Sequence, residues 1–190
     1  MMFVSFIIKL PQKKDYMPLT EHLNYCELSS IKMLLLTGAR RSNVASMHWK
    51  DISLELATWR IPETKNGESY MVNLPDLAMQ ILQHRAISKE KSGWVFASVT
   101  SSSGHLEEPK SAWKRILQRA DIDNVRIHDL RRTLGSYQAI NGASGFIIGK
   151  SLGHKSSFAT AIYARLNADP VRQSVERATA MIFEKREIGI

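Results

Sequence analysis

Four side chains in one stretch of the sequence have the types and the spacing that chemistry on a phosphate group requires. His128 and Arg131 lie three residues apart in the segment HDLR, so in a helix both leave the same face. Both can therefore contact one ligand, and the N-terminus of a helix favours an anion. His154 and Tyr163 follow, nine residues apart. The stretch from 126 to 163 indicates a site for phosphate chemistry.

The surrounding pattern predicts the helices that position these side chains. The segment LRRTLGSYQAI has a helical apolar stripe, which we expect to be buried. The stripe consists of Leu130, Leu134, Tyr137 and Ile140. Gly153 can adopt the positive φ of a residue that ends a helix, and Ser156 or Ser157 can cap the next one. Tyr163 belongs to that next helix.

These motifs, together with two earlier ones, resemble a known family. HDLRRT, LGHKSS and the tyrosine nine residues after the second histidine resemble the second signature block of the tyrosine recombinases, the phage integrase family. The segment LLLTGARRSNVASMHWKDI, at residues 34–52, is similar to the family's TG-x-R segment, and TKNGES, at 64–69, to its lysine-bearing β-turn. Four motifs in family order make the resemblance specific, and it covers the chain from about Lys32 onward.

The resemblance implies that Tyr163 is a nucleophile that forms a 3′-phosphotyrosyl link to DNA and frees a 5′-hydroxyl. A phenol has a pKa of about 10, so it must lose its proton to a base as it attacks. His128 or Lys65 could accept that proton. The leaving oxygen needs a proton in turn, and the ammonium of Lys65 on a mobile turn could donate it.

The other implied roles are electrostatic. Arg40 and Arg131 would stabilise the negative charge that attack concentrates on the non-bridging oxygens, and His154 would add a hydrogen bond. No metal and no cofactor is expected in this chemistry. Three further cations could contact the DNA backbone or simply be exposed: Arg41, Arg132 and Lys155.

Composition agrees with a polyanionic partner. The chain has 190 residues, which suffices for one domain, and a net charge of +8, which favours double-stranded DNA. Cys26 is the only cysteine, so an intrachain disulfide and a cysteine-based zinc site are excluded for a single chain. The opening MMFVSFIIKL lacks the features of a signal peptide, and no run is long enough to cross a membrane. We expect a cytoplasmic protein.

The periodicities predict a mainly α fold with one small antiparallel β-sheet, as the tyrosine-recombinase catalytic domain would have. Thr20 and Ser29 are candidate caps for two helices, and Ser42 for a short third one. Residues 51–75 are typical of a hairpin around an Asn-Gly turn, and 94–98 of another strand. Further helices are expected at 75–91, at 109–120 and from Pro170. We expect a catalytic domain over residues 31–190, with 1–30 poorly matched and the family's N-terminal core-binding domain absent.

Alternatives to an integrase remain open at this stage. A type IB topoisomerase-like enzyme would nick and close DNA with the same kinds of residue, and a non-catalytic remnant would bind DNA without cleaving it. One departure from the family pattern is Asn43, where many members have glutamate that supports the site. The resemblance also implies that full-length protomers assemble as a tetramer on DNA, whereas we expect this chain alone to be a monomer.

Overall fold

A computed structural model describes residues 25–62, 69–87, 93–154, 156, 158–163 and 170–184. The first helices are α3 (Tyr25–Thr37), α4 (Arg41–Ala45) and the 3-10 helix η1 (Trp49–Asp51), followed by the strands β1 (Ile52–Ser53), β2 (Thr58–Ile61) and β3 (Tyr70–Asn73). The remaining helices are α5 (Asp76–Ile87), α6 (Lys110–Ala120), α7 (Asp129–Ile140), α8 (Gly145–Leu152), α9 (Phe158–Ala161) and α10 (Pro170–Glu184). The predicted fold class is confirmed. Over these ranges no helix is long and apolar enough to cross a membrane.

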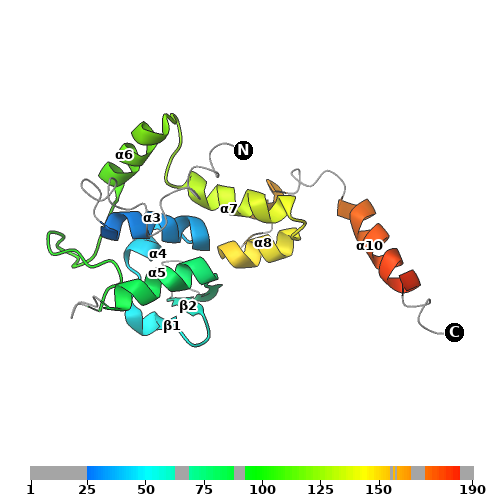
Figure 1. The fold of residues 1–190 in the computed structure, drawn as a ribbon, viewed down its shortest axis with the longest axis horizontal. Helices are drawn as coiled ribbons and strands as arrows, with labels where there is room; N and C mark the ends of the chain where they lie inside the picture. The colour runs from blue at the N-terminus through cyan, green and yellow to red at the C-terminus, as the bar shows by residue number, and fades with distance from the viewer. Residues whose placement is uncertain are drawn as a thin grey trace.

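Helix α3 lies at the centre of the body, in contact with α4, α5, α6 and α7 (Figure 1). Its apolar residues explain this position, because Ile31, Met33 and Leu34 are all buried. The expectation that Ser29 caps a new helix is wrong, since α3 already includes Ser29 and buries it. A serine hydroxyl can be satisfied inside a helix, as that of Ser30 is by donating to the carbonyl of Glu27 at 2.7 Å. Thr20, the other expected cap, lies outside the described residues.

The small sheet is antiparallel, with strand order β1-β2-β3. Trp59 pairs with Val72, and both side chains are buried in the core, as is that of Ile61. The predicted hairpin is confirmed, although its Asn-Gly turn lies outside the described residues. The predicted strand at 94–98 is wrong, because this segment forms only isolated bridges, at Trp94 and Ala97. The third strand of the sheet is β1 instead.

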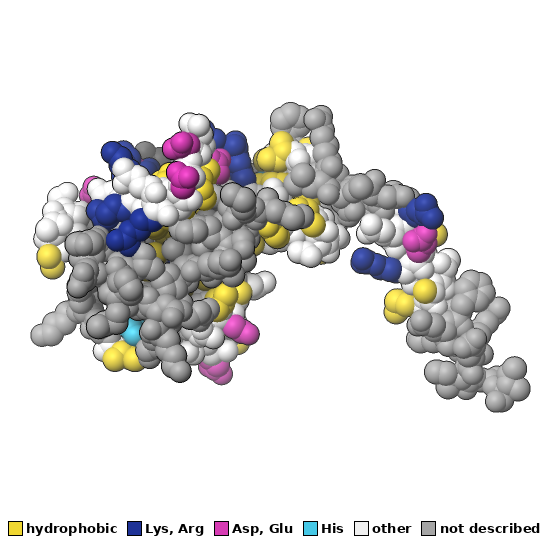
Figure 2. Space-filling model, turned by 45° about the horizontal axis from the view of Figure 1, so that its top comes forward, with side chains coloured by type: hydrophobic (Ala, Val, Ile, Leu, Met, Phe, Trp, Pro, Cys, Tyr) yellow, Lys and Arg dark blue, Asp and Glu magenta, His cyan; other side chains and the backbone are white. Residues whose placement is uncertain are grey.

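Helices α7, α8 and α9 pack together at one end of the body. A second, smaller core of the molecule lies here, and it consists of Ala139, Ile148, Leu152 and Tyr163. Helix α10 stands apart from this body in Figures 1 and 2. All its described side chains, residues 172–181, are exposed, including Val175 and Met181. The described side chains of α10 are therefore not buried against the rest of the domain.

Candidate active site

The turn after α3 explains the sequence TG-x-R. The Thr37 hydroxyl donates to the carbonyl of Met33 at 2.6 Å and accepts from the amide of Ala39 at 3.2 Å, which fixes the turn. Gly38 has a φ of +60°, and a Cβ there would lie 2.5 Å from Leu152 Cδ2. Only glycine therefore lets α8 pack this closely on the turn. The turn places Arg40, the exposed residue before α4, at the edge of the body.

Arg131 lies in the first turn of α7 and is buried, with only 6% of its surface exposed. Its Nη1 donates a hydrogen bond to the carbonyl of Gly38, so the two signature blocks meet at this bond. Burial lowers the pKa of the guanidinium, and Arg40 lowers it further, while the phenols of Tyr70 and Tyr163 act in the opposite direction. An arginine nevertheless stays charged in a protein. The site thus has a fixed cation, Arg131, and a second one, Arg40, close enough to interact with it.

His128 is the residue before α7, as the sequence predicts. Asp129 accepts hydrogen bonds from the backbone amide of Arg126 at 2.9 Å and from its side chain, which closes the turn that carries His128. Burial lowers the pKa of His128, and the charges of Arg131 and Arg132 lower it further. The imidazole is therefore neutral at pH 7 and can accept a proton.

His154 follows Gly153, whose φ of +62° ends α8 as predicted. A Cβ on Gly153 would lie 2.6 Å from the ring of Tyr70, so the close packing also requires glycine. Nδ1 of His154 lies 2.9 Å from the hydroxyl of Thr160, which fixes the ring. Burial lowers the pKa of His154, and the positive charges of Arg131 and Arg40 lower it further. His154 therefore lies within the field of both arginines.

Tyr163 follows α9 and is buried, with 4% of its surface exposed. Its phenol packs on Gly135 of α7, where a Cβ would lie 2.6 Å from Cζ and 2.9 Å from the hydroxyl oxygen. Gly135 stands four residues after Arg131, one helical turn along the same face. Burial raises the pKa of Tyr163, while Arg131 and Arg132 lower it. The phenol is protonated at neutral pH, so it could act as a nucleophile only with the help of a base.

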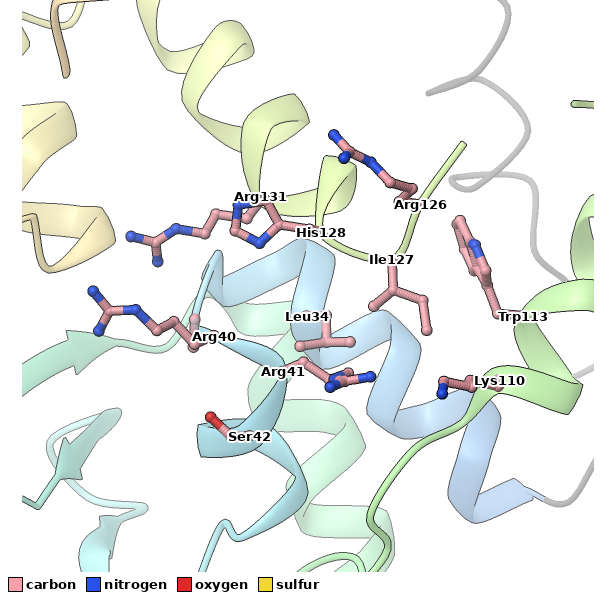
Figure 3. Close-up of a pocket in the computed structure, with 11 residues that line it drawn as sticks. Leu34, Arg40, Arg41, Ser42, Lys110, Trp113, Arg126, Ile127, His128 and Arg131 are labelled. Atoms are coloured by element: carbon pink, nitrogen blue, oxygen red, sulfur yellow. The ribbon is translucent and has the colours of Figure 1, made fainter. Parts of the chain in front are cut away.

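A hollow of about 510 Å³ opens beside these residues (Figure 3). Of the described residues that line it none is acidic, and its basic lining residues are Arg40, Arg41, Lys110, Arg126, His128 and Arg131. The side chains of Arg40 and Arg131 extend toward the same side in Figure 3. His154 and Tyr163 do not line the hollow but interact electrostatically with Arg131. The arrangement suits an oxyanion held between two guanidiniums.

Comparison with known sequences assigns the chain to a family. The sequence model of the phage integrase family matches residues 11–169. The chain belongs to the phage integrase family. It is 33% identical over 164 residues to the prophage integrase IntF of Escherichia coli K12, covering 84% of this chain and 35% of that protein. It is 28% identical to the integrase of Salmonella phage P22, covering 84% of this chain and 47% of that protein.

Solved structures of similar fold agree with this family. The catalytic domain of the bacteriophage HP1 integrase has a TM-score of 0.61 at 19% identity and covers 87% of this chain and 92% of that one. The XerH site-specific recombinase bound to its difH substrate, in a post-cleavage complex, has a TM-score of 0.66 at 20% identity and covers 96% of this chain and 51% of that one. This integrase-family chain therefore has the fold of a tyrosine-recombinase catalytic domain.

The structure brings together five of the residues that the sequence singled out, namely Arg40, His128, Arg131, His154 and Tyr163. Two further candidates, Lys65 and Lys155, lie outside the described residues. Arg132 is exposed and pairs with Asp129 at 3.3 Å. Asn43, at the position where many family members have glutamate, has a buried amide nitrogen without a hydrogen-bond partner among the described residues.

The expected apolar stripe of α7 is wrong in part. Leu130 is fully buried, but Tyr137 and Ile140 are exposed. The buried face instead includes Arg131 and Gly135, because Arg131 is bonded to a backbone carbonyl and Gly135 receives the ring of the tyrosine. Sequence reasoning missed two residues of the site, Gly135 and Thr160. A glycine inside a helical pattern was the available signal for a close approach at position 135.

Proposed function

We propose that this chain is the DNA-cleaving and rejoining domain of a tyrosine-type site-specific recombinase, similar to prophage integrases. The observation that supports this best is the position of Arg131. Its charge acts on His128, His154 and Tyr163, and it lies close enough to Arg40 for the two charges to interact. A base and two permanent cations at one hollow, with a phenol that interacts electrostatically with one of those cations, are what phosphoryl transfer to a phenol requires.

The first half of the reaction cleaves one strand. The oxygen of Tyr163 attacks the phosphorus, the bond from phosphorus to the 5′ oxygen breaks, and the phenolic proton passes to a base. Burial raises the pKa of Tyr163, so the proton must leave as the new bond forms. His128 is neutral at pH 7 and suits the role of that base, and Lys65 is the alternative.

The second half restores the DNA backbone. The leaving 5′ oxygen takes a proton, for which Lys65 is our candidate donor. The 3′-phosphotyrosyl link conserves the energy of the phosphodiester, so a 5′-hydroxyl from another strand can displace the tyrosine. Joining therefore needs neither ATP nor a metal ion, because Arg40 and Arg131 supply the positive charge.

Covalent trapping tests this proposal. A duplex with a nick beside the cleavage site loses its short 5′-hydroxyl fragment, so that the phosphotyrosyl intermediate accumulates. We expect mass spectrometry to find the DNA on the peptide that contains Tyr163. Tyr163→Phe should bind the same DNA and form no adduct, since only the nucleophilic oxygen is removed.

Four other results would contradict the proposal. An adduct on another residue, or with the phenylalanine variant, would exclude Tyr163 as the nucleophile. Binding without any adduct would favour the non-catalytic remnant. Relaxation of supercoiled DNA without any strand exchange between two duplexes would favour a topoisomerase-like activity.

Partners and further contacts are part of the same proposal. XerH and the Tn1549 transposon integrase, both similar in fold to this chain, were solved in complex with DNA. We infer double-stranded DNA as the partner here, in agreement with the net charge of +8. Arg132 and Lys155 are candidate backbone contacts. Full-length protomers would assemble as a tetramer on DNA.

A further inference from the structure

The hollow beside the catalytic residues has a second cationic end. Arg40 and Arg41 are consecutive, yet in Figure 3 their side chains leave the start of α4 in different directions. Arg40 extends toward the side of Arg131, whereas Arg41 extends toward Lys110 of α6. Both Arg41 and Lys110 line the hollow. The hollow therefore lies between two pairs of cations, of which only the pair Arg40 and Arg131 is used by the proposed chemistry.

The second pair, Arg41 and Lys110, already holds an anion from the protein itself. One carboxylate oxygen of Glu108 pairs with Nη1 of Arg41, and the other lies 2.5 Å from Nζ of Lys110. Two cations on one carboxylate are arranged as they would be on two oxygens of a phosphate. All three side chains are accessible, with exposed fractions of 43% for Arg41, 75% for Lys110 and 34% for Glu108. Exposed ion pairs are weak, so a polyanion can displace this carboxylate.

The floor between the two cationic ends is apolar. Leu34 and Ile127 lie in the middle of the hollow, and Trp113 forms part of its wall (Figure 3). The indole nitrogen of Trp113 donates to the carbonyl of Val125 at 3.0 Å, so the ring is fixed. A deoxyribose can lie on such a floor while the phosphates on either side of it meet the cations. Phosphates follow one another at about 3.4 Å of rise per nucleotide of one strand, so a hollow of this size reaches only the next few.

We infer that Arg41 and Lys110 form a binding site for a second DNA phosphate, within a few nucleotides of the one that reacts, and that Glu108 occupies this site until DNA displaces it. The inference rests on the proposed function and adds a positioning contact to it. One anchored phosphate fixes position only, whereas two fix the direction of the strand across the catalytic arginines. Arg126, at the edge of the hollow, is held by Asp129 and is not required for this site.

A methylphosphonate scan tests the second site. Each phosphate near the cleavage position is replaced in turn by an uncharged methylphosphonate, and the affinity of Tyr163→Phe for each duplex is measured. We expect one position, distinct from the reacting phosphate, at which the replacement weakens binding several-fold. Adding Arg41→Ala or Lys110→Ala should remove the sensitivity at that position and leave the other positions unchanged.

Lys114→Ala is the matched control, because Lys114 is an exposed lysine of the same helix that does not line the hollow. It removes the same charge and should leave the scan unchanged. Arg41→Ala and Lys110→Ala should each also lower the slope of log affinity against log salt by up to about 0.9. A scan in which neither substitution alters the sensitivity at any single position, or in which Lys114→Ala has the same effect, would overturn the inference.

The displacement of Glu108 is tested by Glu108→Gln. We expect this substitution to tighten DNA binding several-fold, and to have no such effect when Arg41 and Lys110 are both replaced by alanine. Weaker binding by Glu108→Gln would mean that the carboxylate orients the cations and is not displaced by DNA. These readouts are equilibrium affinities, so they are separate from covalent trapping: a failed scan beside a trapped Tyr163 adduct refutes only the second site.

Discussion

Gly135 offers the sharpest test of the site, because the phenol of Tyr163 rests directly on it. A Cβ at position 135 would lie 2.6 Å from Cζ, 2.8 Å from Cε1 and 2.9 Å from the hydroxyl oxygen of Tyr163. These atoms belong to a rigid side chain that is only 4% exposed, so the surrounding core leaves it no space for a small shift. Gly135→Ala should therefore expel the ring of Tyr163 from its position near Arg131.

Two opposing effects set the change in stability. Alanine is favoured over glycine inside a helix by about 1 kcal/mol, which would stabilise α7. Expelling a buried aromatic ring costs about 1.5–3 kcal/mol of apolar burial. The net expectation for Gly135→Ala is a loss of about 0.5–2 kcal/mol, together with loss of the covalent adduct while DNA binding is retained.

A double-mutant cycle separates the two effects. With Tyr163→Ala in place there is no ring to expel, so adding Gly135→Ala should now stabilise the protein by about 1 kcal/mol. Gly145→Ala is the control, since among the described residues a Cβ there meets only Thr160 Cγ2, at 3.9 Å, and should not destabilise. Urea unfolding measures each free energy. Stabilisation by Gly135→Ala in the presence of Tyr163, or an unchanged adduct yield, would refute the assigned position of the tyrosine.

Three further predictions concern Lys65, the two histidines and Thr160. Lys65→Ala should cleave ordinary DNA poorly but recover when the 5′ bridging oxygen is sulfur, because a thiolate leaves without a proton, and equal defects on both substrates would exclude this role. Folding lowers the pKa values of His128 and His154 from 6.5. As the pH falls, these histidines are therefore protonated in the unfolded chain at a higher pH than in the folded one. The free energy of unfolding should decrease as the pH falls below about 6.5. Urea unfolding at several pH values should show this loss, and replacing both histidines by glutamine should reduce it. Thr160→Val should lower the rate of adduct formation at saturating DNA by releasing His154, and Thr160→Ser should restore it.

Local signals in the sequence were sufficient for much of the fold. The positive φ of Gly153, the start of α7 beside His128 and the pairing of β2 with β3 depend on neighbouring residues or on a short turn, and all were predicted correctly. The strand expected at 94–98 was not, because which segment pairs with a sheet is decided by the packing of the whole domain. The cap expected at Ser29 failed because a serine can also lie within a buried helix.

The residues that could carry the chemistry were predictable from the sequence, but the contacts that position them were not. Residue types and spacing singled out the catalytic candidates, since these must meet one phosphate. Three contacts that support the site each join different elements. They are the packing of Tyr163 on Gly135, the hydrogen bond between Thr160 and His154, and the ion pair between Glu108 and Arg41. No periodicity within one element can indicate such pairs. Arg131 is also buried although its side chain is charged, because a backbone carbonyl accepts its hydrogen bond.

That carbonyl belongs to Gly38, and its position would make the proposed cleavage conditional on folding. The bond from Arg131 to Gly38 joins α7 to the end of α3, so the second arginine is aimed only when those two helices have docked. The acceptor is a backbone atom, which every sequence variant retains. A chain in which α7 has not yet packed on α3 can still attract DNA through its net charge of +8, but it cannot present two guanidiniums to one phosphate. Under the proposed function, partly folded copies of this basic chain would therefore bind DNA without breaking it.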